Sequence, residues 1–219
     1  EFDRLNKSLE ALIEKNTAIY KSQREFVENA AHELQTPLAL FQNKIDVLFQ
    51  MKLNKEQTQV LGSLSRDVVK LNRLNKNLLL LSKIEHEIYL EKNTISINNH
   101  IEKHLNFFTE QAELKNIAIN VQAPEKLQIS GNLILTEILI NNLLLNAIRH
   151  NRSEGNIIIR IMENELQVLN TGDDKPLPID KLFNRFFNSG SSSNGNGLGL
   201  SIIKKITENI TRSIDDLLS

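Results

Sequence analysis

The sequence contains no cysteine, carries almost no net charge and has no long apolar run. Without cysteine, the chain can form neither disulfide bonds nor thiolate metal sites, a composition that fits a reducing compartment. The net charge of −1 gives no electrostatic reason to expect a nucleic-acid partner. No apolar stretch reaches the roughly 18–20 residues that cross a bilayer, and no signal peptide is visible. We therefore expect neither nucleic-acid binding nor membrane contact within this stretch of chain.

The residues that are present suffice for a substantial core. Of the 219 residues, 40% are hydrophobic and 24% are charged, which allows one large or two modest domains. The chain begins at Glu1 inside a helical pattern and without an initiator methionine. We therefore expect it to be a fragment of a longer protein.

The first 90 residues carry the pattern of two long helices. Apolar residues spaced by three or four predict one helix over about 1–50 and, after a connection at 51–55, a second over about 56–90. The repeat in the second helix consists of Leu64, Val68, Leu71, Leu74, Leu78 and Leu81. Two such helices form an antiparallel hairpin, but one hairpin cannot bury both apolar stripes. We therefore predict that two chains pair into a four-helix bundle.

Residues 91–219 change to short, mixed elements, so a second domain is expected to begin there. The predicted strands are 94–97, 117–121, 127–130, 156–161 and 165–169, and the predicted helices are 99–115, 131–150 and 198 to about 210. This mixture indicates an α+β fold, in which an α/β sandwich has the sheet on one side and the helices on the other.

The segment 26–40 places a histidine on the polar side of the first helix. Counted at about 100° per residue, the apolar residues gather on one face, and His32 falls opposite the middle of it. This face consists of Phe26, Ala30, Leu34, Pro37, Leu38, Phe41, Ile45 and Leu48. Glu33 adjoins His32, and Pro37 deprives the Glu33 carbonyl of its helical N–H, so the helix should loosen or bend there. An exposed helical histidine is usually only a surface residue, but this setting indicates a reactive imidazole.

A second group of polar residues lies in the second domain. Asn142 and Asn146 sit one turn apart on an otherwise apolar helix, where their amide oxygens could join a magnesium shell; plain surface amides are the alternative. Residues 194–201, NGNGLGLS, run a glycine-rich loop into a helix start whose free N–H groups suit a triphosphate. Five of the eight glycines lie between Gly172 and Gly199, the composition of a mobile loop or of a disordered linker.

Five short motifs occur in an order and spacing that resemble the sensor histidine kinases of two-component signalling. They are the H-box (32–37, HELQTP), the N-box (142–146), the first glycine box (170–172), the phenylalanine box (182–187) and the second glycine box (195–200). The resemblance extends from about residue 26 to residue 206. For the second domain it implies the ATP-binding fold shared by gyrase, Hsp90, histidine kinases and MutL.

The resemblance implies a protein histidine kinase that binds ATP and Mg²⁺ and passes the γ-phosphoryl group to His32. A neutral imidazole can attack the γ-phosphorus directly, and Glu33 is placed to hold or deprotonate the ring nitrogen that does not attack. Thr36 lies one turn from His32, where its hydroxyl could orient a water for attack on an aspartyl phosphate. Gln35 stands where the family usually has lysine or arginine.

The resemblance also implies the nucleotide ligands. Asn142 and Asn146 would bind the magnesium–nucleotide complex, Arg149 would meet phosphate, and Asn170 replaces an aspartate that accepts a hydrogen bond from adenine. The remaining positions are His150, which replaces a frequent tyrosine, and Gly172, Gly195, Gly197, Leu198 and Gly199 of the two glycine boxes. Asp174 stands where a second glycine is usual and could narrow the pocket.

We therefore predict a dimerisation and phosphotransfer hairpin over 1–90 and an ATP-binding catalytic domain over 91–219. The implied partners are a second copy of the chain and the receiver domain of a response regulator, and the implied location is the cytoplasmic portion of a membrane-anchored sensor. The alternative is a non-catalytic dimeric scaffold with a degenerate nucleotide domain. Another ATPase of the same fold is disfavoured because it would lack the hairpin that carries His32.

Two further features stand apart from the motifs. Residues 208–219 do not resemble the two strands that finish the family's sheet, so we expect a sheet without its last strands and a weakened nucleotide domain. His100 and His104 are four apart on a predicted helix, a spacing that can bind metal, but no third ligand is evident. We expect them to be two surface histidines.

Overall fold

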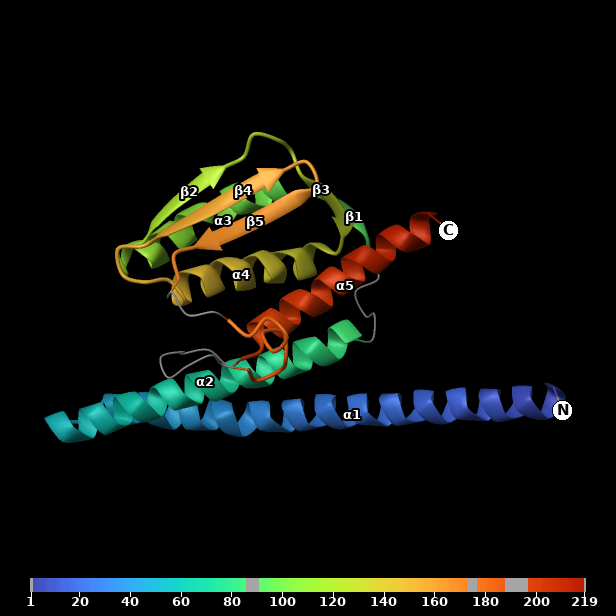
Figure 1. Cartoon of the computed structure of the whole chain (residues 1–219). Helices are drawn as coiled ribbons and strands as arrows, with labels where there is room; N and C mark the ends of the chain where they lie inside the picture. Colours follow the sequence, from blue (N-terminus) through green and yellow to red (C-terminus); the bar gives the residue numbers. More distant parts are fainter. Residues whose placement is uncertain (1, 86–90, 173–176, 188–196, 219) are drawn as a thin grey trace. The chain divides into compact units, whose positions relative to one another are not determined.

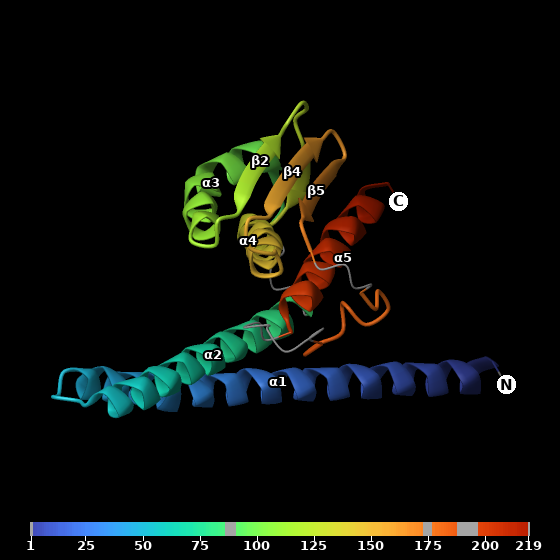
Figure 2. The same ribbon diagram turned by 60° about the vertical axis from the view of Figure 1, so that its left-hand side comes forward.

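The computed structural model describes residues 2–85, 91–172, 177–187 and 197–218, with side chains in the last helix to residue 210. The chain divides into two compact units, Glu1–His86 and Glu87–Ser219. Figures 1 and 2 show two long helices in the first unit and a small α/β domain in the second, as the sequence predicts. None of the described helices is both long enough and apolar enough to span a bilayer.

The first unit is a hairpin of two helices, α1 (Phe2–Phe49) and α2 (Lys55–Glu85). A reciprocal cap begins α2, because Gln57 N donates to Asn54 Oδ1 at 2.8 Å while Asn54 N donates to Gln57 Oε1 at 3.0 Å. Helix α1 runs unbroken through Pro37 and is drawn as a straight rod in both views. The bend predicted at Pro37 is therefore wrong, because the continuous helix on either side holds this turn in helical conformation.

The two helices pack along one face of each. Helix α1 buries Ala31, Leu38 and Ile45, which are seven residues apart. Ile45 packs with Leu61 and Val68 of α2 in an apolar cluster. A spacing of seven on both helices is typical of a coiled coil, in which residues at one heptad position recur every two turns along the seam.

The apolar face predicted for α1 is correct only in part. Leu38 and Ile45 are buried, but Phe26, Leu34, Phe41 and Leu48 are exposed. In α2, Val68 and Leu81 are buried whereas Leu64 and Leu71 are exposed. We call these exposed residues of both helices, together with Val60, the open stripe. Spacing by three or four marks residues that can share an apolar face, and the partner helix covers only half of that face here.

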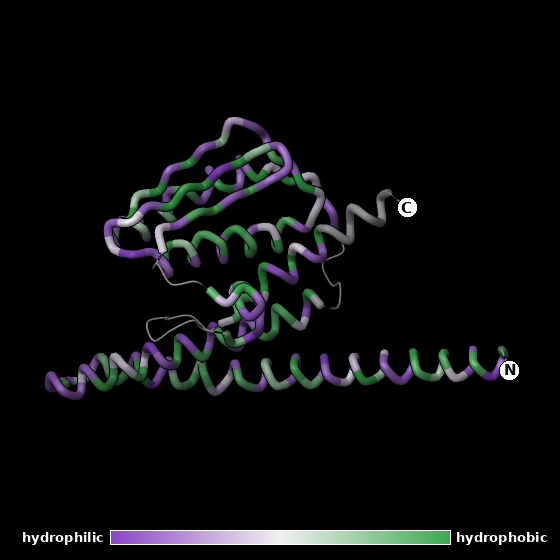
Figure 3. Tube along the Cα trace, viewed as in Figure 1, coloured by the Kyte–Doolittle hydropathy of each residue, from purple (hydrophilic) through white to green (hydrophobic). Residues whose placement is uncertain are grey.

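The N-terminal half of α1 continues this exposed apolar pattern. Phe2, Leu5, Leu9, Leu12 and Ile19 are all exposed. Figure 3 shows apolar residues recurring along the whole length of α1.

The second unit is an α+β domain. In chain order it consists of β1 (Asn93–Ser96), α3 (Ile97–Glu113), β2 (Ala118–Gln122), β3 (Gln128–Gly131), α4 (Leu133–Arg149), β4 (Asn156–Met162), β5 (Glu165–Asn170) and α5 (Gly199–Leu218). These bounds lie within two residues of the predicted ones, except that α5 continues beyond residue 210. Among the described residues, β1 pairs antiparallel with β3, and β4 lies between a parallel β2 and an antiparallel β5.

Helices α3 and α4 cover one face of the three-stranded sheet (Figures 1 and 2). Alternate residues of β4, Ile157, Ile159 and Ile161, point into the core and are almost fully buried. They meet Phe108 of α3 and Leu144 of α4 in one cluster. This core fixes α4, and thereby the asparagines that α4 carries.

Candidate functional site

His32 lies on the exposed side of α1, as the sequence predicts. Its neighbour Ala31 is buried in the hairpin seam, so the next residue must turn outward at 100° per residue. Glu33 and Thr36 are exposed as well. The imidazole, the carboxylate and the hydroxyl therefore share one accessible patch on α1, where a protein or nucleotide can reach all three.

Sequence reasoning missed a residue behind this patch. Asn75 of α2 is 3% exposed, and its Nδ2 donates to the carbonyl oxygen of Ala31 at 2.6 Å. The signal that could have found it is the repeat of seven that runs through Leu61, Val68 and Asn75. A polar residue at a position where the repeat calls for an apolar one indicates a buried hydrogen bond.

Helices α4 and α5 bring the N-box and the second glycine box together. Asn142 is half-buried, and its Nδ2 donates to the carbonyl oxygen of Ile138 at 2.8 Å. Its Oδ1 is therefore free to face α5, and a Cβ added at Gly199 would lie 3.3 Å from it. The amide oxygen thus stands against the first residue of α5, where the N–H groups of a helix start are unpaired and attract anions.

Asn146 lies one turn beyond Asn142 and is also half-buried. An amide oxygen is a neutral hard ligand of the kind that Mg²⁺ accepts when phosphates and waters complete its shell. The Asn142 oxygen beside a helix start therefore suits a magnesium–phosphate group.

A backbone contact joins the phenylalanine box to the second glycine box. Phe186 N donates to Gly197 O at 2.8 Å, and both residues have positive φ, 65° in each case. A Cβ at Gly197 would lie 2.6 Å from the carbonyl carbon of Phe186, so only glycine fits there. Leu198, the next residue, is fully buried and anchors the start of α5.

The first glycine box lies at the end of β5, beside the C-terminus of α4. Asn170 Nδ2 donates to the carbonyl oxygen of His150 at 3.2 Å, which leaves its Oδ1 as the acceptor that an adenine amino group would need. Thr171 is tied to Asn156 by backbone and side-chain hydrogen bonds. A Cβ at Gly172 would meet no atom of the described residues within 4 Å, so they leave the space in front of this turn open.

Positive charge gathers at the C-terminus of α4. Arg149 is half-buried in the last turn, and Lys115 Nζ donates to the carbonyl oxygen of Ile148 at 3.2 Å. The pKa of His150 lies below its ordinary value, because the ring is partly desolvated and the charges of Arg149 and Lys115 oppose protonation. A neutral His150 can accept as well as donate a hydrogen bond.

Some predicted positions lie outside the described residues. They are Gly195 and Asp174. In the phenylalanine box, Phe183 and Phe186 are exposed and Phe187 is half-buried.

His100 and His104 are not the plain surface histidines that we expected. Both are half-buried, their ring centroids are 5.3 Å apart, and His104 Nε2 lies 3.7 Å from Glu137 Oε1 of α4. Among the described residues no group of three histidine, cysteine or acidic side chains is arranged to hold a metal. The pair is therefore part of the packing between α3 and α4.

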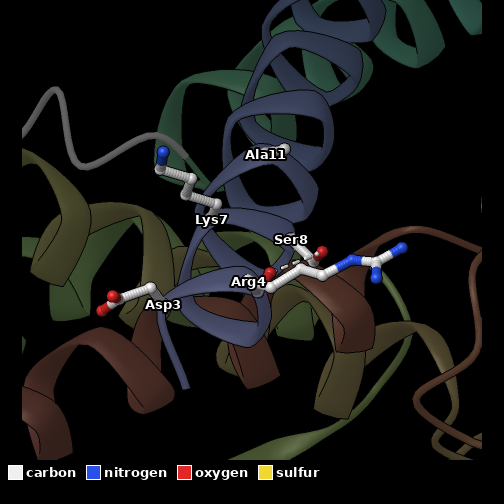
Figure 4. Close-up of a pocket in the computed structure, with 5 residues that line it drawn as sticks. All are labelled: Asp3, Arg4, Lys7, Ser8 and Ala11. Carbon is white, nitrogen blue, oxygen red and sulfur yellow. Dashed lines mark hydrogen bonds between the residues drawn. The ribbon is translucent and has the colours of Figure 1, made fainter. Parts of the chain in front are cut away.

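A shallow depression lies on the first turns of α1. Figure 4 shows its lining residues, which are Asp3, Arg4, Lys7, Ser8 and Ala11. Ser8 Oγ donates to the carbonyl oxygen of Arg4 at 2.9 Å and so serves the helix itself. Because one helix supplies the whole lining, the depression cannot enclose a ligand.

Two families match this chain. Residues 22–87 match the His Kinase A (phospho-acceptor) domain, and residues 131–215 match the histidine kinase-, DNA gyrase B- and HSP90-like ATPase domain. The first match contains His32 and Asn75, and the second contains α4 and the start of α5.

Curated relatives match over nearly the whole chain. The heme sensor protein HssS of Staphylococcus saprophyticus is 29% identical over 94% of this chain and 45% of its own length. The sensor protein kinase PmrB of Pseudomonas aeruginosa is 30% identical over 91% of this chain and 43% of its own length. The sensor histidine kinase HprS of Escherichia coli is 28% identical over 93% of this chain and 46% of its own length. The chain thus spans less than half the length of these relatives.

Two solved structures share the fold. Full-length ShkA in complex with AMPPNP has a TM-score of 0.66 at 19% identity, covering 84% of this chain and 40% of its own. The Acinetobacter baumannii histidine kinase AdeS has a TM-score of 0.55 at 20% identity, and the match covers 80% of this chain and 85% of the AdeS chain. Both likenesses support a long helical hairpin followed by a small α/β domain.

Proposed function

Because this chain belongs to the sensor histidine kinases of two-component systems, we propose that it autophosphorylates on His32 and passes the phosphoryl group to an aspartate of a response regulator. The observation that carries the proposal is the exposed position of His32, on a phospho-acceptor hairpin that shares the chain with an ATPase domain. An imidazole packed into the hairpin seam could not reach a nucleotide.

The transfer to His32 is a substitution at the γ-phosphorus. A neutral ring nitrogen forms the N–P bond while the bond from the γ-phosphorus to the β–γ bridging oxygen breaks, and ADP carries away that electron pair. Glu33 accepts the proton of the other ring nitrogen as the ring becomes positive. The exposed carboxylate on the next residue supports this role.

The nucleotide binds the second unit between α4 and the start of α5. On α4, the phosphates face Asn142, Asn146 and Arg149. The backbone N–H groups at the start of α5, from Gly199, donate hydrogen bonds to the negatively charged phosphates. Asn170 Oδ1 accepts a hydrogen bond from the adenine amino group, and Gly172 leaves room for the base. The open space at Gly172 and the Asn142 oxygen beside Gly199 support this arrangement.

Magnesium would be held by the amide oxygens of Asn142 and Asn146, and when bound it neutralises charge on the phosphates. These two asparagines also orient the nucleotide, since α4 is fixed by the core of the domain.

The hairpin pairs with a second copy through the open stripe. Phe26, Leu34, Phe41 and Leu71 are each at least half exposed, which is unusual for large apolar residues in regular spacing. A four-helix bundle covers all of them at once. The parent protein would be a membrane-anchored sensor, with this chain in its cytoplasmic portion.

Labelling with [γ-³²P]ATP tests the proposal. We expect acid-labile, alkali-stable label on the wild-type chain, and none on His32→Gln. Replacement of the half-buried Gln35 three residues on, Gln35→Ala, is the matched control and should keep the label. Label that persists in His32→Gln would refute the assignment, and a chain that binds ATP without becoming labelled would favour the scaffold alternative.

Thr36 supports a second activity, dephosphorylation of the regulator. Its exposed hydroxyl lies one turn from His32, where it can orient a water toward an aspartyl phosphate docked on this patch. Thr36→Ala should keep labelling of His32 and slow regulator dephosphorylation by about tenfold or more. Thr36→Ser, which keeps the hydroxyl, should restore the rate. Equal dephosphorylation rates in the wild type and Thr36→Ala would exclude this role.

A further inference from the structure

The seam inside the hairpin changes character along its length. At the end near the connection, Ile45 packs with Leu61 and Val68, and Leu53 lies against them. One heptad on from Val68, α2 presents Asn75 instead of an apolar residue, and one heptad further it presents Ser82. Both are buried. In this heptad row of α2 the buried side chains are therefore apolar far from His32 and polar beside it, while Leu79, Leu81 and Ile84 of the same helix are also buried.

The contact at Asn75 joins the two helices next to His32. Asn75 Nδ2 donates to Ala31 O at 2.6 Å, across 44 positions of sequence. In a regular helix that carbonyl already accepts the N–H of the residue four positions on, so the amide is an additional donor. Ala31 is the residue before His32 and is itself buried.

The oxygen of the Asn75 amide has no hydrogen bond, within the described part of the chain, to offset its burial. Its Oδ1 is buried and has no hydrogen-bond partner among the described residues, and the same holds for Ser82 Oγ. A buried amide that satisfies only its donor lowers stability relative to an apolar side chain of similar shape. A polar residue at a core heptad position does, however, fix the register between helices, because other registers leave it wholly unpaired.

We propose that Asn75 is the positioning residue of the phospho-acceptor: its bond to the Ala31 carbonyl fixes the register and rotation of α1 at the turn that carries His32. The inference rests on the proposed role of His32. The nearest residue of the apolar cluster lies one heptad away on α2, at Val68, and two heptads away on α1, at Ile45, and apolar contacts are less directional than a hydrogen bond. A single directional bond at Ala31 does resist them, because sliding or rotating α1 breaks it.

The test exploits the opposite effects expected on stability and on rate. Asn75→Leu removes the costly amide and extends the apolar seam, so the hairpin should melt at a higher temperature. The turn that carries His32 loses its register bond, so kcat for autophosphorylation should fall at least about tenfold, within the ~100-fold that a misplacement of an ångström can cost. The KM for ATP should not change, because the nucleotide binds the other unit.

Two further variants separate positioning from packing. Asn75→Asp keeps the shape but cannot donate when ionised, and it should lower kcat as Asn75→Leu does while lowering the melting temperature. Ser82→Ala, in the next buried layer of the same seam, removes a hydroxyl without a partner and should leave kcat within about twofold.

The register can be measured without any kinase activity. Because the chain has no cysteine of its own, cysteines introduced at chosen positions can be labelled specifically. Spin labels on Asn29→Cys of α1 and Lys76→Cys of α2, both exposed positions, should give one narrow distance distribution within the hairpin when labelled chains are diluted with unlabelled ones, in the otherwise wild-type chain and in Ser82→Ala. Asn75→Leu should broaden or shift it. Unchanged distances and an unchanged kcat in Asn75→Leu would overturn the proposal. If the wild type takes no label on His32, the proposed function fails, while the distance measurement still decides whether Asn75 sets the register.

Discussion

At the scale of single residues, Gly199 connects two motifs that lie far apart in the sequence. Its missing side chain lets the Asn142 amide oxygen approach the start of α5, since an added Cβ would lie only 3.3 Å from Oδ1. A contact this short forces one of the two groups to move. The site therefore depends on a small residue at a position where the helix itself would accept alanine.

We predict that Gly199→Ala weakens ATP binding by about 1 kcal/mol or more, a loss of at least roughly fivefold in affinity. Isothermal titration with a non-hydrolysable ATP analogue in the presence of Mg²⁺ measures this. Gly62→Ala is the matched control, because among the described residues its Cβ would meet only Arg66 Nη1, at an ordinary 3.6 Å. It should raise the stability of the hairpin by about 1 kcal/mol and leave ATP affinity unchanged. Equal affinities for the wild type and Gly199→Ala would show that Asn142 does not act beside α5.

His100 makes a pH-dependent contribution to the second unit. Its pKa is lowered, first by burial, then by the charge of His104 and of Lys103, with Glu137 of α4 opposing them. The unfolded chain therefore binds a proton at this residue at a higher pH than the folded chain does. The stability that the neutral ring contributes is fully present above the unfolded pKa of about 6.5 and is lost as the pH falls below it.

We expect the free energy of unfolding of the second unit to fall between pH 7 and pH 5, and His100→Gln to reduce that fall. Urea titrations followed at several pH values measure both slopes. A wild-type slope that equals the slope of His100→Gln would mean that another group titrates in this range.

At the scale of helices and strands, the open stripe is the feature that the single chain leaves unexplained. We predict that Leu71→Asp dissociates the dimer, because burying a carboxylate in the bundle without a partner is costly. The dissociation constant should rise by about thirtyfold or more, which corresponds to the ~2 kcal/mol of an interface hot spot. Val69→Asp is the control, since Val69 is equally exposed but lies on another side of α2. Sedimentation equilibrium that gives one molecular mass for all three proteins would rule out this interface.

The elements themselves were predictable from sequence, but their faces were not. Strands such as β4 show a strict alternation, and the predicted strand 156–161 differs from it by one residue. In α1, by contrast, Leu34 and Leu38 have the same spacing and polarity, yet only Leu38 is buried within the chain. Periodicity reports which residues can share a face, and it carries no information on whether the same chain or a second copy covers them.

The candidate site likewise contains residues that local spacing predicts and contacts that it does not. His32 and the pair Asn142 and Asn146 lie where their helical spacing predicted, since both depend on local geometry alone. Asn75 and the contact between Asn142 and Gly199 depend on residues 44 or more positions apart, and only the packing of whole helices brings them together. The bend expected at Pro37 failed because a local rule was applied to a helix that its long flanks stabilise.

At the scale of the whole molecule, each unit has a core of its own. The hairpin buries its seam between α1 and α2, and the second unit buries a larger cluster between α3, α4 and the sheet. The two cores nevertheless differ in how complete they are. The second core closes around fully buried residues such as Phe108 and Ile157, whereas the open stripe leaves large side chains of the hairpin in water.

This difference predicts two separable unfolding transitions that respond to different variables. The hairpin gains its missing burial from a second copy, so its melting temperature should rise with protein concentration by mass action. The second unit needs no copy, and its melting temperature should be independent of concentration. It should rise with ATP and Mg²⁺ instead, because ligand at 100-fold above its dissociation constant adds about 2.7 kcal/mol to the free energy of unfolding. Calorimetry over a hundredfold range of protein concentration, with and without nucleotide, separates the two responses. A single transition that shifts with both variables would mean that the units unfold together, and a hairpin transition that ignores concentration would mean that the open stripe stays uncovered in solution.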